Sequence, residues 1–382
     1  MLPLIRSAKI ASFALLLLGL SLFFPMAKSA QAQEDSLPIG FCGALTGRSS
    51  AYGISVKKGA ELAVERINLS EGIDGQKLEL LSVDDQQKER LSSEKITSLI
   101  YDSNVLAIIG TTDSGCTHVA ARIAMKARVP LIATVATDPS LTRLNNPYVF
   151  RNLADDLIQG KALVKHMIDD RRIRDIAIVH VDTRYGRGGA AVVEEAIRDR
   201  KRSPLARLTF DSGQRDFGDL LSKLEKLRPK AMVLWGLYPE GAALTKATKE
   251  RIPGIEIFGP DGLAAKAFIE EAGRAAEGVT LTYPFNPRRK NDPLVASFIE
   301  GFEEKYDETP DSFAAHAYDA VYQIAEAMKI GGKSRRGILL GLKKLNPFHG
   351  VAGTFSFDEN GNSTLPVFLA TIEQGSFRVK KD

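Results

Sequence analysis

Short apolar runs alternate with amphipathic stretches along most of the sequence, and this alternation limits the folds open to the chain. The clearest unit covers residues 106–127, where an apolar run is followed by a glycine, four small polar residues and apolar residues at helical spacing. The same succession repeats over residues 37–140, and a second cycle runs over residues 157–262. Strands that alternate with helices predict parallel sheets covered on both faces. We therefore predict an α/β fold with two doubly wound parallel-sheet lobes.

The last part of the chain departs from this alternation. Residues 293–343 have the apolar spacing of helices, and strands are predicted again at 353–357, 367–372 and 377–380. Helices this late in the chain need a sheet to cover. We expect that sheet to belong to the first lobe, so the chain would cross back and forth between the lobes.

Residues 1–32 have the pattern of a secretory signal peptide. Arg6 and Lys9 supply the positive charge, residues 10–24 an apolar segment, and Ala30-Gln31-Ala32 a cleavage site between small residues. The apolar segment is short for a membrane-spanning helix, and no later run is long enough to span a bilayer. We expect export, cleavage near Ala32 and a periplasmic location.

The charge of the remaining chain is nearly balanced. Without residues 1–32, Lys and Arg fall from 51 to 48 against 47 Asp and Glu, a net charge of +1. Nucleic-acid binding therefore loses its compositional support, and we expect no nucleic-acid partner. After removal of residues 1–32 from the 382, about 350 residues remain. This is too many for one compact core and favours two domains.

The reactive side chains form no recognisable catalytic or metal site. The five histidines lack metal-ligand spacing, and the sequence has no nucleophile elbow, phosphate loop or dinucleotide fingerprint. Cys116 and His118 would diverge at a helix start, and His118 is more simply a surface residue. Cys42 and Cys116 allow one disulfide, with two buried thiols as the alternative. We expect no enzyme activity, no cofactor and no metal.

Side chains at the strand exits are the candidates for a binding site, because ligands of parallel α/β sheets bind beyond the carboxyl ends of the strands. Hydroxyls and free N–H groups at a helix N-terminus suit a carboxylate, and an Asp suits an amine. Each candidate also has a simpler interpretation, such as Ser114 capping the helix that follows it. The candidates are Tyr52, Asp113, Ser114, Val135, Thr137, Tyr185, Leu237, Tyr238 and Asp261.

Taken together, these segments resemble the type I periplasmic solute-binding proteins, in the branch that includes the leucine/isoleucine/valine-binding protein of ABC importers. The resemblance covers nearly all of the chain after residue 32, and the order and spacing of the motifs make it specific. The motifs are IGFCGALTGRSSAYG at 39–53, EGIDGQKLEL at 71–80, IIGTTDSGCT at 108–117, TVATDPSLT at 134–142, IAIVHVDTRYGRG at 176–188, LYPEG at 237–241 and FGPDG at 258–262.

The resemblance implies two lobes that are joined by three crossovers and close over a ligand by a hinge motion. The crossovers would match residues 152–156, 283–286 and 364–367. The N-terminal lobe would then comprise residues 33–155 and 284–364, and the C-terminal lobe residues 156–283 and 365–382.

The resemblance also implies roles for individual residues. Ser114 and Thr137 would hold the ligand carboxylate, and the Val135 carbonyl and Asp261 would hold its ammonium group. The side-chain pocket would be lined by Tyr52, Thr112, Tyr185 and Phe313.

Three departures from the family pattern leave the ligand open. Asp261 is a Glu in the amino-acid binders, Leu237 stands where a ligand-binding Tyr is expected, and Asp113 replaces an uncharged residue. Tyr238 would point elsewhere, and Asp113 would repel a ligand carboxylate unless it faced solvent or a second cation.

The resulting hypothesis is an exported binding protein that captures an amino acid, with branched-chain types favoured, and delivers it to the membrane permease of an ABC importer. Amides and aromatic or aliphatic carboxylates remain alternative ligands. A ligand-sensing receptor or regulator of the same fold is the alternative function.

Overall fold

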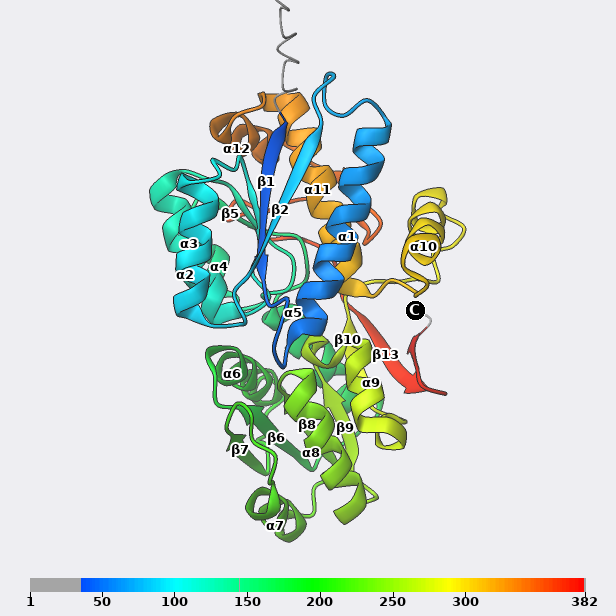
Figure 1. Cartoon of the computed structure of the whole chain (residues 1–382). Coiled ribbons are helices and arrows are strands. Elements are labelled where there is room, and N and C mark those ends of the chain that lie inside the picture. The colour runs from blue at the N-terminus through cyan, green and yellow to red at the C-terminus, as the bar shows by residue number, and fades with distance from the viewer. Residues whose placement is uncertain (1–35, 144, 381–382) are drawn as a thin grey trace, which may run out of the picture. The chain divides into compact units, whose positions relative to one another are not determined.

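The computed structural model describes residues 36–143 and 145–380. The signal peptide expected at residues 1–32 lies outside this range. Two large sheets and the helices around them form two lobes within the described chain (Figure 1). None of the helices in this range is long and apolar enough to cross a membrane.

The first sheet is entirely parallel, with strand order β2-β1-β3-β4-β5. In β1, Ile39 and Phe41 face one apolar cluster while Cys42 faces another, as expected where alternate side chains of a strand point to opposite faces. Both faces of this sheet are therefore buried. Its strands are β1 (Leu37–Gly43), β2 (Leu78–Asp84), β3 (Ile108–Gly110), β4 (Leu131–Ala133) and β5 (Val149–Arg151).

Helices from both ends of the described chain cover this first sheet. Figure 1 shows α2 and α3 on one side of it and α1 with α11 on the other. The late helices thus cover the first sheet, as predicted, because α11 packs along α1. The helices of this lobe are α1 (Ser50–Leu69), α2 (Glu89–Tyr101), α3 (Ser114–Ala127), α4 (Ser140–Arg143), α10 (Pro293–Tyr306), α11 (Ser312–Gly331) and α12 (Arg335–Lys344).

The second sheet has the order β14-β13-β10-β9-β8-β6-β7. Five of its strands are parallel, but β13 pairs antiparallel with β10, and β14 pairs antiparallel with β13. The prediction of purely parallel sheets is therefore incomplete. The strands are β6 (Ile176–Val181), β7 (Ala206–Phe210), β8 (Ala231–Trp235), β9 (Glu256–Gly259), β10 (Thr280–Tyr283), β13 (Phe368–Glu373) and β14 (Ser376–Val379).

A two-residue turn explains the antiparallel pair. Gln374 and Gly375 both have positive φ, 52° and 66°, which is the geometry that lets a chain reverse between twisted strands. The predicted strand at 353–357 is shorter in the structure, where β12 (Thr354–Phe355) pairs only with β11 (Phe348–His349).

Helices and short helical turns surround the second sheet. They are α5 (Asp156–Val164) with a π-helical continuation (Lys165–Asp170), α6 (Arg184–Arg198), α7 (Gly218–Leu227), α8 (Tyr238–Arg251) and α9 (Lys266–Ala272), together with two 3₁₀ turns, Asp261–Leu263 and Gly273–Ala276.

The chain passes from one sheet to the other between β5 and β6, and it returns after β10 to the helices of the first lobe. It enters the second sheet again at β13. The exact domain limits given above stay a prediction.

The close packing of α1 against α11 depends on a glycine. A Cβ atom at Gly59 of α1 would lie 2.1 Å from the backbone oxygen of Ala314 in α11, far inside van der Waals contact. The two helices can approach this closely only because Gly59 has no side chain.

We expect Gly59→Ala to lower the free energy of unfolding by about 1–3 kcal/mol, because α1 and α11 must move apart. Gly188→Ala in α6 is the matched control, since a Cβ there meets nothing within 4 Å. It should be neutral or stabilising by about 0.5–1 kcal/mol. Urea denaturation of both variants checks this, and equal effects would contradict the packing role of Gly59.

Candidate functional site

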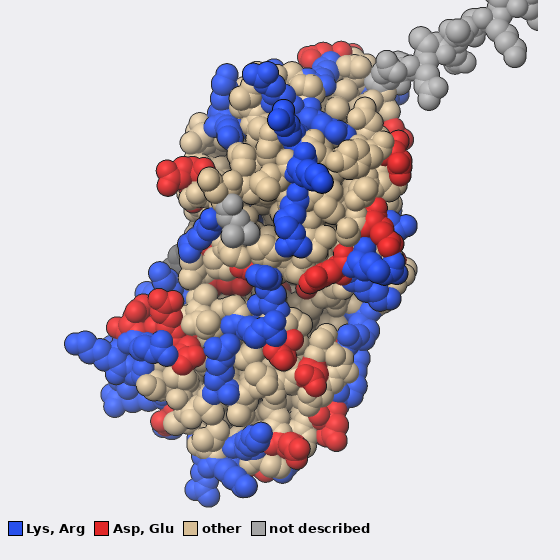
Figure 2. Space-filling view, turned by 90° about the vertical axis from the view of Figure 1, so that its left-hand side faces the viewer, with Lys and Arg blue, Asp and Glu red and all other residues tan. Residues whose placement is uncertain are grey.

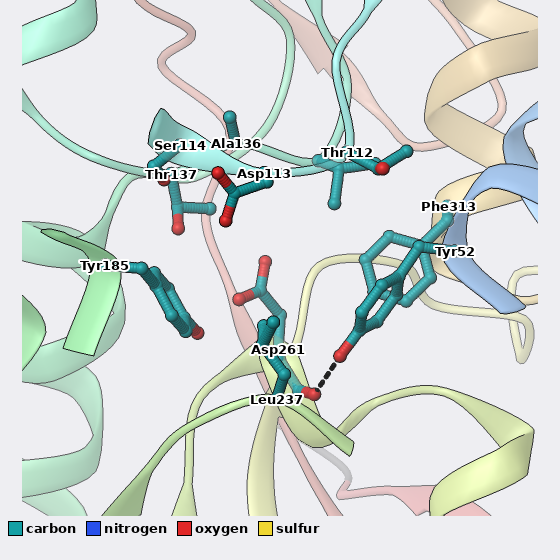
Figure 3. A pocket seen from close by; sticks show the side chains of 12 residues that line it. Tyr52, Thr112, Asp113, Ser114, Ala136, Thr137, Tyr185, Leu237, Asp261 and Phe313 are labelled. Carbon is teal, nitrogen blue, oxygen red and sulfur yellow. Dashed lines mark hydrogen bonds between the residues drawn. The ribbon is translucent and has the colours of Figure 1, made fainter. Parts of the chain in front are cut away.

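A cavity lies where the carboxyl ends of strands from both sheets meet (Figure 3). Its volume is about 20 Å³, room for about one water molecule. All ten predicted site residues line it, together with Ala136 and Gly262. The ten are Tyr52, Thr112, Asp113, Ser114, Val135, Thr137, Tyr185, Leu237, Asp261 and Phe313.

The lining residues come from strand exits of both lobes and from four helices. Thr112 and Asp113 follow β3, residues 135–137 follow β4, Leu237 follows β8, and Asp261 follows β9. The remaining side chains come from Ser114 of α3, Tyr52 of α1, Tyr185 of α6 and Phe313 of α11. Four strand exits and four helices thus supply one cavity.

The N-terminus of α3 forms one wall of the cavity. Asp113 is the N-cap, and its Oδ1 accepts a hydrogen bond from the Cys116 N–H at 3.0 Å. The prediction that Ser114 caps this helix is therefore wrong. Ser114 is the first helical residue, one position too late for a cap. It and Thr137 are both almost fully buried at this wall.

This wall can hold an anion. The first N–H groups of a helix have no partner within the helix and carry the positive end of its dipole. The hydroxyl groups of Ser114 and Thr137 lie on the same side of the cavity in Figure 3. A carboxylate placed here would accept hydrogen bonds from both hydroxyls and from free backbone N–H groups.

Asp113 is held by protein donors. Its Oδ1 caps α3, and its Oδ2 accepts a hydrogen bond from Gln87 Nε2 at 3.3 Å. We expected the Asp113 carboxylate to face either solvent or a second cation. The structure offers a third arrangement, because the N-terminus of α3 stabilises the negative charge of Asp113.

The opposite wall carries an unpaired carboxylate. Asp261 is 2 % exposed, and its Oδ2 has no hydrogen-bond partner. Figure 3 shows its carboxyl group pointing into the cavity, on the side facing the α3 wall. Burial raises the pKa of Asp261 to about 7. A bound ammonium group could therefore supply the hydrogen-bond donor and the positive charge that the Asp261 carboxyl lacks.

Aromatic side chains fill the space between the two walls. The ring of Tyr52 packs edge-on against both Phe313 and Tyr238, with 5.1 Å between ring centroids in each pair. Leu237 lines the cavity, whereas Tyr238 is not among its lining residues and donates its hydroxyl hydrogen to the Arg48 carbonyl at 2.5 Å. At the N-terminus of α8, Leu237 thus lines the cavity, while Tyr238 binds the backbone of the first lobe.

The hydroxyl of Tyr52 joins the two lobes. It donates a hydrogen bond to the Gly262 carbonyl at 2.5 Å and accepts one from the Tyr238 N–H at 3.0 Å. A salt bridge of 2.8 Å between Arg48 and the buried Glu240 also crosses between the lobes. The described structure is therefore the closed arrangement of the two lobes.

A groove runs beside the cavity and shares Asp113 and Tyr185 with it. Arg48, Lys88, Arg184 and Arg187 line this groove together with Glu89 and Asp113. Three of the four basic side chains form ion pairs, Arg48 with Glu240, Arg184 with Asp138 and Arg187 with Asp182. On the face shown in Figure 2, Lys and Arg are interspersed with Asp and Glu.

The structure also shows the surroundings of His118 and of the two cysteines. His118 is 6 % exposed, and its Nε2 lies 2.8 Å from Asp138 Oδ2, so its prediction as a surface residue is wrong. It lies on the side of α3 that packs against the loop after β4. Cys42 and Cys116 are both free and buried, and burial raises the pKa of each thiol.

The chain matches the family model described as periplasmic binding protein over residues 36–376. The chain belongs to this family. It is a substrate-binding protein of the ABC transporter type, in the branch resembling Leu/Ile/Val-binding proteins. The family is one of non-enzymatic binding proteins.

Similar proteins are known from several bacteria. A Leu/Ile/Val-binding protein homolog of Brucella abortus (strain 2308) is 27 % identical over 352 residues, which cover 92 % of this chain and 94 % of the relative. The substrate-binding protein LivJ of Streptococcus pneumoniae, solved in complex with isoleucine, is 30 % identical with a TM-score of 0.85. The alignment covers 91 % of this chain and 100 % of that one.

A more distant structure shares the fold. A solute-binding protein of R. palustris, solved in complex with benzoate, is 21 % identical with a TM-score of 0.82, and the match covers 90 % of this chain and 95 % of that one. At this identity the likeness concerns the fold alone.

Sequence reasoning missed one buried acid next to the cavity. Asp156, the first residue of α5, is fully buried, and neither of its carboxyl oxygens has a hydrogen-bond partner. Its position directly after Asp155, the N-cap of α5, makes it look in sequence like ordinary helix-capping chemistry.

We expect Tyr52→Phe to cost about 1–3 kcal/mol, because the Gly262 carbonyl and the Tyr238 N–H would lose a buried partner. The cost falls on the closed arrangement, so small-angle scattering should show a larger radius of gyration. Tyr306→Phe is the control, since the Tyr306 hydroxyl bonds Lys58 within one lobe. An unchanged radius of gyration in Tyr52→Phe would contradict the bridging role.

The raised pKa of Asp261 predicts a pH-dependent cost in stability. A carboxyl with a pKa of 3.8 when unfolded and about 7 when folded loses folding free energy as the pH rises between these values. The loss is at most about 4 kcal/mol. We therefore expect Asp261→Asn to raise the melting temperature of the ligand-free protein more at pH 8 than at pH 5.

The control for this measurement is Asp307→Asn, because Asp307 is exposed and its positive φ of 54° suits Asn as well. Asp307→Asn should leave the pH profile unchanged. Parallel profiles of the parent and Asp261→Asn would show that the carboxyl is not unfavourably buried.

Proposed function

We propose that the protein captures an α-amino acid, with a branched aliphatic side chain as the leading candidate, and delivers it to the membrane permease of an ABC importer. One observation carries this proposal: a single closed cavity has anion-binding chemistry at one wall and an unpaired buried carboxyl at the other. An α-amino acid carries the complementary pair of charges on adjacent groups.

The assigned roles follow from these two walls. Ser114, Thr137 and the N-terminus of α3 bind the ligand carboxylate. Asp261 binds the ammonium group, together with the carbonyl of Val135. The ligand side chain lies among apolar and aromatic groups, which are Tyr52, Thr112, Tyr185, Leu237 and Phe313.

The lining of the cavity favours an aliphatic side chain. The closed arrangement leaves only about 20 Å³ free, so the lining residues must move apart to admit a ligand, and the apolar groups among them then gain free energy when aliphatic carbons replace water. The isoleucine bound by the S. pneumoniae relative supports this choice.

Capture proceeds by closure of the lobes over the ligand. The hydrogen bonds of Tyr52 and the salt bridge between Arg48 and Glu240 form only when the lobes approach, so they stabilise the loaded state. Export to the periplasm, with cleavage near Ala32, is supported by the pattern of residues 1–32.

A thermal-shift panel of amino acids, amides and aromatic acids tests the ligand class. We expect a branched-chain amino acid to raise the melting temperature most, because binding to the folded state stabilises it by mass action. A panel in which only amides or benzoate raise the melting temperature would refute the amino-acid assignment.

Variants test the residues. Ser114→Ala and Asp261→Ala each remove a charge-assisted hydrogen bond of about 1.5–3 kcal/mol, so affinity should fall about 10- to 100-fold in isothermal titration calorimetry. Ser222→Ala, which loses a hydrogen bond to the Gly218 carbonyl and one from Arg251 but lies outside the cavity lining, should leave affinity unchanged. Unchanged affinity in Asp261→Ala would remove Asp261 from the site.

A further inference from the structure

Three buried side chains beside the cavity lack hydrogen-bond partners for their polar atoms. These atoms are both carboxyl oxygens of Asp156, Oδ2 of Asp261 and the hydroxyl of Tyr185. Asp156 is fully buried, Asp261 is 2 % exposed, and Tyr185 is 6 % exposed. Buried polar atoms are normally paired, so a group of four unpaired ones beside one cavity needs an explanation.

Asp156 does not line the cavity and lies behind one of its walls. Its backbone N–H donates to the carbonyl of Thr137 at 3.0 Å, which ties it to the wall formed by residues 135–137. Gln159, one turn after Asp156 in α5, accepts a hydrogen bond from the Asp261 N–H at 3.0 Å, which places the two acids near each other. The charge of Asp261 adds to the effect of burial in raising the pKa of Asp156. Asp156 and Asp261 thus form a carboxylate pair that includes one cavity-lining member.

No described cation is bonded to this pair. The nearest guanidinium, Arg151, is buried, but its hydrogen bonds go to Asn362, Asp138, Thr142 and Asp155. The twelve residues that line the cavity include no Lys or Arg. The pair therefore faces a cavity that contributes no positive charge of its own.

We propose that Asp156 makes the cavity selective for ligands with a protonated amine: the Asp156–Asp261 pair holds one proton in the empty cavity and releases it to solvent when an ammonium group binds. The ammonium then replaces the proton as the positive charge beside the two carboxylates. This inference rests on the proposed function and adds the residue and the charge balance that decide which ligands enter.

The amine requirement separates two ligand classes that share the carboxylate. A carboxylic acid without an amine, such as benzoate, would satisfy the α3 wall but leave Asp261 unpaired or protonated. An amino acid supplies up to three N–H donors to the pair and to the Val135 carbonyl. Asp156 acts through its charge on Asp261, so it is a positioning residue.

The pH dependence follows from the groups around the pair. Burial raises the pKa of both carboxyls, that of Asp261 to about 7, and a proton on the pair competes with the ligand ammonium. Affinity for an amine should therefore rise from pH 5.5 to pH 7.5. The other titratable or charged groups facing the pair are Arg151 on β5, Asp138 after β4, Asp155 before α5, Tyr185 on α6 and Tyr52 on α1.

Isothermal titration calorimetry in two buffers of different ionisation enthalpy measures the protons released on binding. The probes are L-isoleucine, its analogue without the amine (3-methylpentanoate), its analogue without the carboxylate (2-methylbutylamine), and benzoate. The variants are Asp156→Asn and, as the matched control, Asp307→Asn, because Asp307 is an exposed carboxylate outside the cavity lining.

For the parent protein we expect release of a substantial fraction of one proton with L-isoleucine at pH 7, and about tenfold weaker binding at pH 5.5 than at pH 7.5. In Asp156→Asn the proton release should be smaller than in the parent and the affinity should depend less on pH, and what remains of both should come from Asp261, whose own burial raises its pKa. At pH 8 the same variant should bind L-isoleucine about tenfold more weakly than the parent. Asp307→Asn should keep the parent's proton release and pH profile.

Several results would overturn the proposal. One is proton release in Asp156→Asn equal to that of the parent. Another is a parent protein that binds 3-methylpentanoate or benzoate as tightly as any amine-bearing probe, or binds no amine-bearing probe. If the protein binds 2-methylbutylamine but does not bind L-isoleucine, the amine selectivity would be supported and the amino-acid function refuted.

A measurement without ligand tests the proton held by the Asp156–Asp261 pair separately from the proposed amino-acid binding. If the pair holds a proton, Asp156→Asn should raise the melting temperature of the ligand-free protein more at pH 8 than at pH 5.5. An equal shift at both pH values would overturn the proton-holding pair even if the protein binds amino acids.

Discussion

The hydroxyl group of Tyr52 is the point on which the closed arrangement depends. It donates to one strand exit of the second lobe at Gly262 and accepts from another at Tyr238, while its ring packs on Phe313 of the first lobe. Because both hydrogen-bond partners are buried, neither can exchange its bond for water without opening the lobes. Tyr52, which itself lines the cavity, thus helps to position the cavity walls relative to one another, together with the salt bridge between Arg48 and Glu240. A change in the occupant of the cavity therefore acts directly on the contact that holds the lobes together.

The site is built at a cost to the stability of the protein alone. Asp261, Asp156 and Tyr185 leave buried oxygen atoms without partners, whereas the other buried carboxylates in the described part of the chain have hydrogen-bond partners. Burial raises the pKa of Asp319 to about 7, as it does that of Asp261, but the oxygens of Asp319 accept hydrogen bonds from the Val351 and Ala352 N–H groups. The missing donors, and not burial alone, distinguish the carboxylates at the cavity. A ligand that supplies the missing donors gains the free energy that the empty site lacks.

Much of this arrangement could be predicted from the sequence, because strand exits in a parallel α/β fold converge at one edge. Apolar runs and polar exits located both cycles of strands, and all ten residues proposed for the site line one cavity. Details that depend on single positions were harder. Ser114 and Asp113 differ by one residue in the cap, which no periodicity resolves. His118 is buried only because Asp138, twenty residues later, folds back onto α3. Asp156 looks like helix-capping chemistry, and only its missing partners distinguish it.

The edge of the second sheet has a consequence for how the protein is made. β13 and β14 come from residues 368–379; β14 pairs with β13, and β13 pairs with β10, about ninety residues earlier in the chain. The edge of β10 therefore stays unpaired until β13 has been made. The helices α10, α11 and α12 of the first lobe lie between these two strands in the chain, so the second lobe can complete its sheet only after those helices have been made.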